Sequence, residues 1–111
     1  MLYHEKLDVY QAAIKLTALC ITIGEGIPKG HAALAEQLRR AAMSIPLNIA
    51  EGVGKPSGAD QARFHAIARG SAMECGAILD IVRLLGGGRE STDHAKELVV
   101  RIVEMLSKMC R

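Results

Sequence analysis

The sequence predicts an all-α protein that folds as an antiparallel up-down-up-down four-helix bundle, with one domain over residues 1–111. Half of the 111 residues are hydrophobic but only 3% are aromatic, which disfavours β-sandwiches and small barrels, whose strands prefer aromatic and β-branched side chains. Glycine and proline gather in three clusters, at 24–30, 52–58 and 86–88. The four segments that these clusters separate have the length and the apolar spacing of helices.

The first predicted helix covers about residues 3–23. Its apolar side chains occupy about half of the circumference, whereas a surface helix needs an apolar arc little wider than about 100°. They are Tyr3, Leu7, Tyr10, Ile14 and Ile21 on one side, widened by Val9, Ala13, Leu16, Cys20 and Ile23.

The second predicted helix covers about residues 32–52 and is also apolar on more than one face. A core stripe and a second apolar group lie on opposite sides of it. The stripe comprises Leu34, Leu38, Ala41, Ile45 and Ile49, and the second group comprises Met43, Leu47, Ala50 and Val53. Pro46 lies inside this helix, so the backbone bond to the carbonyl of Ala42 is missing and a kink is expected.

The third helix is predicted to begin at residue 57 or 58 and to run to about 85. Ser57 and Asp60 have the spacing of a capping box. A fourth helix should begin at Ser91, Thr92 or Asp93, all suitable N-caps, and continue to about residue 109. Only this last helix is cleanly amphipathic.

The first three helices therefore carry more apolar surface than an antiparallel bundle of four can bury. Large exposed apolar surfaces mark association sites. The pattern predicts a homo-oligomer.

A row of polar residues also follows the second helix, within an arc of about 80°. It comprises Gln37, Arg40, Ser44, Asn48 and Glu51. The row is either a solvated face or a half-buried hydrogen-bonding network that sets the register between helices or subunits. A catalytic role ranks third, because neither His nor Cys joins the row.

Glu74 lies on the apolar face of the third helix. A carboxylate there needs a partner or a raised pKa. Arg40 is the first candidate partner and Arg39 the second. A structural ion pair is a commoner explanation for such a carboxylate than an active site.

Two stretches carry a family resemblance: residues 37–57, QLRRAAMSIPLNIAEGVGKPS, and residues 63–79, RFHAIARGSAMECGAIL. They resemble the signature of four-helix-bundle proteins encoded in intervening sequences of bacterial 23S ribosomal RNA genes. The resemblance implies an antiparallel four-helix bundle that assembles as a pentamer, with no established activity for most members. Related accessory proteins of diversity-generating retroelements use a basic surface for contacts with RNA or reverse transcriptase.

Four basic residues are candidate nucleic-acid contacts: Arg39, Lys55, Arg63 and Arg69. Repetition around an oligomer would strengthen a modest basic patch. Glu36 and Asp60 stand three residues before Arg39 and Arg63, however, and local charge compensation is the alternative. The near absence of aromatic residues predicts that any RNA is bound through its phosphates rather than by base stacking.

The sequence predicts no disulfide, metal or cofactor site. The odd number of cysteines (Cys20, Cys75 and Cys110), their long spacings and the single histidines argue against a disulfide framework, a metal site or a cofactor. No apolar run reaches the roughly 18 residues of a membrane span, and a reduced cytoplasmic protein is expected. The favoured function is non-enzymatic assembly or macromolecule binding; the alternative is a ligand-binding or enzymatic site built on Glu74, Glu51 and Arg40.

Overall fold

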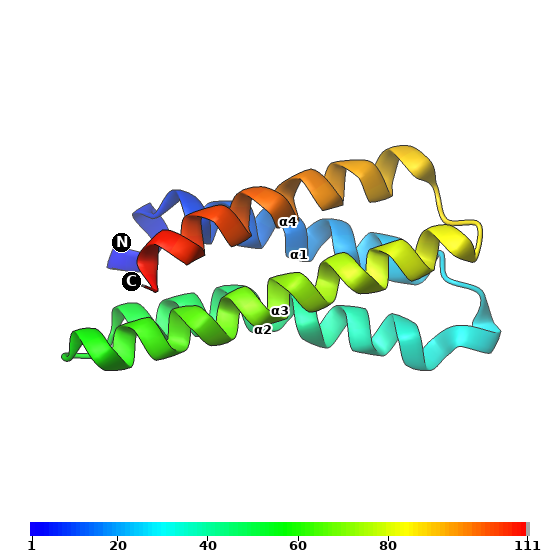
Figure 1. Ribbon diagram of the computed structural model, residues 1–111. Helices are drawn as coiled ribbons and strands as arrows, with labels where there is room; N and C mark the ends of the chain where they lie inside the picture. The colour runs from blue at the N-terminus through cyan, green and yellow to red at the C-terminus, as the bar shows by residue number, and fades with distance from the viewer. Residues whose placement is uncertain (111) are drawn as a thin grey trace.

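The computed structural model describes residues 1–110; position 111, the last of the predicted domain, lies outside this range. The chain forms α1 (Asp8–Glu25), α2 (Ala32–Val53), α3 (Gly58–Leu84) and α4 (Arg89–Met109), with short 3₁₀ turns η1 (Tyr3–Lys6) and η2 (Lys29–His31) before α1 and α2. The helices alternate in direction along one long axis, and the N- and C-terminal ends lie at the same end of the bundle (Figure 1). The predicted all-α four-helix bundle is confirmed.

The four helices stand at the corners of a square. Each packs against the next in sequence, and α1 also packs against α4. Within residues 1–110, no Cα atom of α1 lies within 8 Å of a Cα atom of α3, so these two helices are diagonal. One apolar core fills the space between the four helices. Its fully buried large aliphatic residues are Leu16, Leu38, Ile45, Ile49, Leu79, Ile102 and Leu106.

The N-terminal segment differs from the continuous helix predicted over 3–23. Leu7 is extended, with φ −78° and ψ 131°, and it separates η1 from α1. The short turn is held by local bonds, because the Leu2 backbone N–H donates to the Glu5 carboxylate at 3.1 Å and the Gln11 amide donates to the Glu5 carbonyl at 3.1 Å. Asp8 then lies in the first turn of α1, where a negative charge is favourable.

The predicted start of the fourth helix is also wrong by a few residues. α4 begins at Arg89, directly after the Gly86–Gly88 loop, and Gly88 is its N-cap. Thr92 is fully buried inside the helix, and its hydroxyl donates to the carbonyls of Gly88 at 2.9 Å and Arg89 at 3.1 Å. Threonine at this position therefore bonds back to the first turn instead of capping it.

At the start of α3, by contrast, Ser57 caps the helix. Its hydroxyl accepts the Asp60 backbone N–H at 3.1 Å. One of the free N–H groups of the first turn is thereby satisfied.

Pro46 is buried within α2 and leaves the Ala42 carbonyl without its helical donor. The Thr17 hydroxyl of α1 takes that place, at 3.2 Å from the Ala42 carbonyl oxygen, while it also contacts the Ala13 carbonyl of its own helix at 2.8 Å. A buried carbonyl without a donor is costly. This contact therefore joins α1 to α2 at the position of the proline.

Replacing Thr17 by Val keeps the side-chain shape but removes the donor to the Ala42 carbonyl. We expect Thr17→Val to lower the free energy of unfolding by about 1–3 kcal/mol, the cost of a buried polar group left unpaired. The measurement is urea denaturation at a fixed chain concentration. Thr22→Val is the matched control, because Thr22 is exposed on the same helix. Equal losses in the two variants would contradict this role for Thr17.

Candidate functional site

Part of the polar row of α2 lies in the groove between α2 and α3. The Ser44 and Ser71 hydroxyl oxygens are 2.8 Å apart across this groove. The Asn48 side-chain amide donates to the Ser44 carbonyl at 2.8 Å and to the Ser44 hydroxyl at 2.9 Å. All three residues are half-buried. Ser71 was not predicted as a partner of the row, although a serine within an otherwise apolar stripe of the third helix was a usable signal.

The charged members of the row do not meet as expected. Gln37 donates to the Glu74 carboxylate at 3.2 Å, but Arg40 contacts Glu36 of its own helix at 3.2 Å, and its side chain is 79% exposed. The predicted Arg40–Glu74 pair is therefore wrong within one chain. Glu74 is exposed rather than held on a buried apolar face, and Glu51 is exposed near the end of α2.

Arg39 also binds Glu36. Its Nε and one terminal nitrogen lie 3.0 Å and 2.6 Å from the two carboxylate oxygens. These hydrogen bonds, together with the nearby positive charges of Arg39 and Arg40, lower the pKa of the Glu36 carboxyl. Two arginines thus share one carboxylate, which leaves a positive charge in excess at this position on α2.

Lys55 and Arg63 lie together at the connection between α2 and α3. Both cations pack over the ring of Phe64, with the Lys55 ammonium 5.1 Å and the Arg63 guanidinium 4.7 Å from the ring centroid. Such cation–π contacts hold long side chains in place. Asp60 compensates Arg63 only loosely, at 3.8 Å. The single phenylalanine of the chain therefore holds together two of the four predicted basic contacts, Lys55 and Arg63.

The other two basic candidates lie elsewhere. Arg39 is near the start of α2, about 20 Å along the helix from its end at Val53. Arg69 is half-buried against α4, where it donates to the Ser107 hydroxyl at 3.4 Å. The prediction of one basic patch formed by all four residues is wrong, because helical spacing distributes them over different heights and faces.

Large exposed apolar residues are concentrated on the first three helices. They are Ile14 and Ile21 on α1, Met43 and Leu47 on α2, and Ile67, Met73, Ile81 and Leu84 on α3. Within the described part of the chain, α4 contributes only Val100 to this group. No helix between residues 1 and 110 is long and apolar enough to cross a membrane. Within the described residues, the exposed large apolar side chains of the helices are therefore distributed over α1, α2 and α3, with only one on α4.

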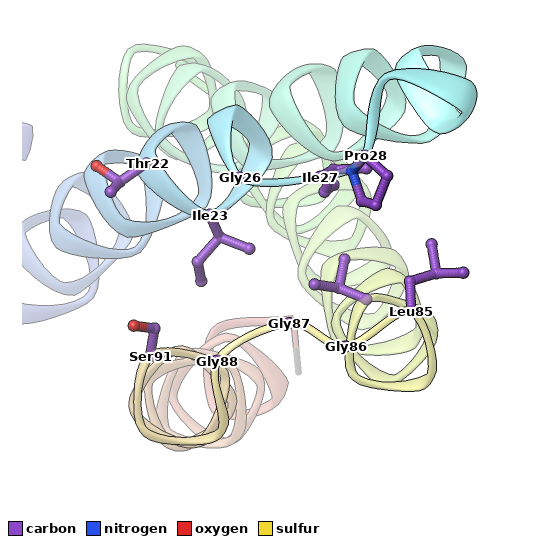
Figure 2. Close-up of a pocket in the computed structure, with 11 residues that line it drawn as sticks. Thr22, Ile23, Gly26, Ile27, Pro28, Leu85, Gly86, Gly87, Gly88 and Ser91 are labelled. Carbon is purple, nitrogen blue, oxygen red and sulfur yellow. The ribbon is translucent and has the colours of Figure 1, made fainter.

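A pocket of about 350 Å³ opens at the end of the bundle that carries the α1–α2 and α3–α4 connections (Figure 2). Its walls are mostly apolar side chains and the Gly86–Gly88 backbone, and the side chains of Thr22 and Ser91 are its only polar ones. Arg40, Glu51 and Glu74 do not line it. The three residues of the alternative enzymatic site thus do not converge on this cavity.

Cys20 and Cys75 are buried in the core, where the neighbouring Cys20 thiol and burial raise the pKa of the Cys75 thiol. They belong to α1 and α3, whose Cα atoms are more than 8 Å apart. A disulfide needs a Cα separation of about 4.4–6.8 Å. These cysteines cannot be bridged without moving the backbone. Across residues 1–110, no three His, Cys, Asp or Glu side chains are grouped as metal ligands.

His65 is the one buried histidine among the described residues. Its ring lies against Gly52 of α2, where an added Cβ would be only 3.0 Å from Nε2. Neither ring nitrogen has a hydrogen-bond partner of good geometry within residues 1–110. Burial lowers the pKa of His65, and the nearby Met109 backbone offsets part of this effect.

Comparison with known proteins decides the family. The model of the 23S rRNA-intervening sequence proteins matches residues 5–108. The chain belongs to this family. The match spans the polar row, the Lys55–Arg63 cluster and all four helices, so the resemblance inferred from residues 37–57 and 63–79 is confirmed over nearly the whole chain.

A solved structure shows the same fold. It is a protein of unknown function from the S23 ribosomal protein family of Bacteroides thetaiotaomicron VPI-5482, with a TM-score of 0.85 and 20% sequence identity. The alignment covers 93% of this chain and 98% of that one. No protein with a curated description matches the chain. Membership of the 23S rRNA-intervening sequence family thus establishes the fold and the relatives, and leaves the activity open.

The buried His65 makes the stability of this family member sensitive to acid. Because burial lowers its pKa in the folded state, the unfolded chain binds more protons as pH falls through about 6.5, and the free energy of unfolding decreases by at most about 1.4 kcal/mol per pH unit. We expect His65→Gln to remove the part of this decrease in the free energy of unfolding that comes from protonation of His65. Thermal unfolding from about pH 7.5 to 5 measures it.

His94→Gln is the matched control, because His94 is exposed on α4. It should retain the acid sensitivity of the wild type. If His65→Gln and the wild type lose stability in parallel over this pH range, the acid sensitivity does not come from His65.

Proposed function

We propose that this protein is a non-catalytic scaffold that assembles into a closed homo-oligomer. The observation that carries the proposal is the position of the exposed apolar residues, eight of which lie on α1–α3. Large exposed apolar surfaces on a soluble protein mark association sites. The family resemblance favours five subunits. The proposal includes a single domain over 1–111 and a reducing cytoplasmic location, in keeping with three unpaired cysteines.

The polar row supports a structural role rather than catalysis. Its best-formed part consists of two hydroxyls and an amide, Ser44, Ser71 and Asn48, which bond to one another. These groups are neither nucleophiles with an adjacent base nor a carboxylate pair. Such a network instead fixes the register of packed helices.

RNA binding is a second candidate function, which the Lys55–Phe64–Arg63 cluster favours. Two cations held over one ring at the α2–α3 connection present positive charge at the tip of each bundle. In a ring of subunits this cluster repeats, and repetition raises the affinity for a phosphate backbone without new contacts.

The assembly proposal predicts that charge on the apolar side dissociates the oligomer. Wild-type protein at micromolar concentration should scatter light as a particle several times heavier than the 11.9 kDa chain. Leu47→Glu should reduce that mass, because a carboxylate would have to be buried without a partner. Leu47 is 64% exposed, so the isolated subunit should still fold.

Val100→Glu is the control for this experiment, since Val100 is 53% exposed on the otherwise polar face of α4. It should keep the wild-type mass. A wild-type mass of one chain would refute assembly, and a loss of mass in Val100→Glu alone would show that the wrong side of the bundle was chosen.

The RNA candidate predicts binding that depends on charge and tolerates sequence changes. A labelled single-stranded RNA should lose affinity with salt at a slope of about −0.7 per contacted phosphate. Lys55→Glu with Arg63→Glu should abolish binding and leave the mass unchanged. Arg101→Glu with Lys108→Glu makes the same change in charge on exposed positions of α4 and should retain binding. If the labelled RNA binds neither the wild type nor the control variant at low salt, RNA binding is refuted as a function of this protein.

A further inference from the structure

Two opposite charges on the α2–α3 side lack a full partner within the chain. Arg40 shares Glu36 with Arg39, which already holds both carboxylate oxygens. Glu74 accepts only the neutral amide of Gln37. The carboxylates in ion pairs within residues 1–110 are Glu36, Asp60, Asp80 and Asp93, and Glu74 is not among them. Arg40 and Glu74 are therefore exposed charges of opposite sign that no ion pair within residues 1–110 neutralises fully.

These two charges lie at nearly the same height along the bundle. The contact between Gln37 and Glu74 places residue 74 of α3 beside residue 37 of α2. Arg40 is one turn from Gln37, about 4.5 Å along the helix axis. A rotation about an axis parallel to the bundle preserves height. It therefore brings Arg40 of one copy level with Glu74 of the next.

The apolar residues form two strips that match along the same axis. One strip follows α1 and α2 and includes Ile21, Ile14 and Met43, whereas the other follows the outer side of α3 from Ile67 to Leu84. The hydrogen bond from Thr17 to Ala42 relates α1 to α2, and the contact between Ser44 and Ser71 relates α2 to α3. The middles of the two strips therefore lie at about the same height along the bundle axis. At one end, residues next to Ile21 and Leu84 line the same pocket (Figure 2).

The α1–α2 strip also contains a recess that suits side chains from α3. A groove of about 470 Å³ runs between these helices, and its lining includes Ile21, Gly24, Ala35 and Arg39. On α3 the Leu84 side chain is 85% exposed and Ile81 is 43% exposed. Two different strips on one chain fit a heterologous interface, which generates a ring when the rotation between neighbouring copies closes.

We propose that the α1–α2 strip of one copy packs against the α3 strip of the next, and that Arg40 of the first copy pairs with Glu74 of the second. This inference rests on the proposed self-assembly and specifies its interface. The pair lies at the edge of the contact, beside the α2–α3 groove. It sets the register of neighbouring copies, because complementary charge selects one alignment of two long apolar strips.

Charge exchange tests the pair. Arg40→Glu and Glu74→Arg each place like charges opposite one another, and each should raise the dissociation constant of the oligomer about tenfold or more. The double variant Arg40→Glu/Glu74→Arg restores opposite charges and should return to within about threefold of the wild type. Light scattering over a dilution series measures the mass, and far-UV circular dichroism confirms that each variant is folded.

Glu97→Arg and Arg101→Glu are the matched controls, because both side chains are exposed on α4, outside the proposed interface. They should keep the wild-type dissociation constant. If the wild type assembles but the single reversals do not weaken it, or the double variant is not restored, the proposed pair is wrong while self-assembly stands. If the wild type remains a monomer at every concentration, both the interface and the proposed function are refuted.

Discussion

The contact between the Thr17 hydroxyl and the Ala42 carbonyl is the constraint on which the arrangement of this bundle depends. Pro46 deprives that carbonyl of its helical donor, and a donor from another helix must replace it because the site is buried. The replacement comes from the middle of α1, so the height of α1 against α2 is set at this point.

A second contact between helices begins two residues further along α2, at Ser44. With Ala42 turned toward α1, the residues that follow it turn toward α3, where Ser44 meets Ser71 and Asn48 completes the group. Hydrogen bonds are directional and cannot slide as apolar contacts can. The polar row thus aligns α2 with α3 in the same way that the threonine aligns α1 with α2. Because both registers are set within one chain, each subunit presents a rigid outer surface.

That surface combines apolar strips with a few charges, and packing of the four helices within one subunit does not bury it. Four helices arranged in a square expose the outer side of each, and within the described residues α4 carries just one of the large exposed apolar side chains of the helices. The charge excess beside Glu36 and the carboxylate of Glu74 lie where the apolar strips border the polar row. Membership of the 23S rRNA-intervening sequence family accounts for the fold, and the physical basis for assembly lies in this uncovered surface.

Hydrophobic periodicity, glycine clusters and the missing N–H of Pro46 determined the helix number, the approximate boundaries and the apolar excess, because these properties depend on local spacing. The partners of the polar and charged side chains could not be predicted from the spacing of residues along the sequence. Arg40 has carboxylates within reach both on its own helix and on α3, and only the packed structure shows that it contacts Glu36. In the same way, the burial of His65, the two cations over Phe64 and the donor from Thr17 depend on which helices lie side by side, which the tertiary structure alone decided.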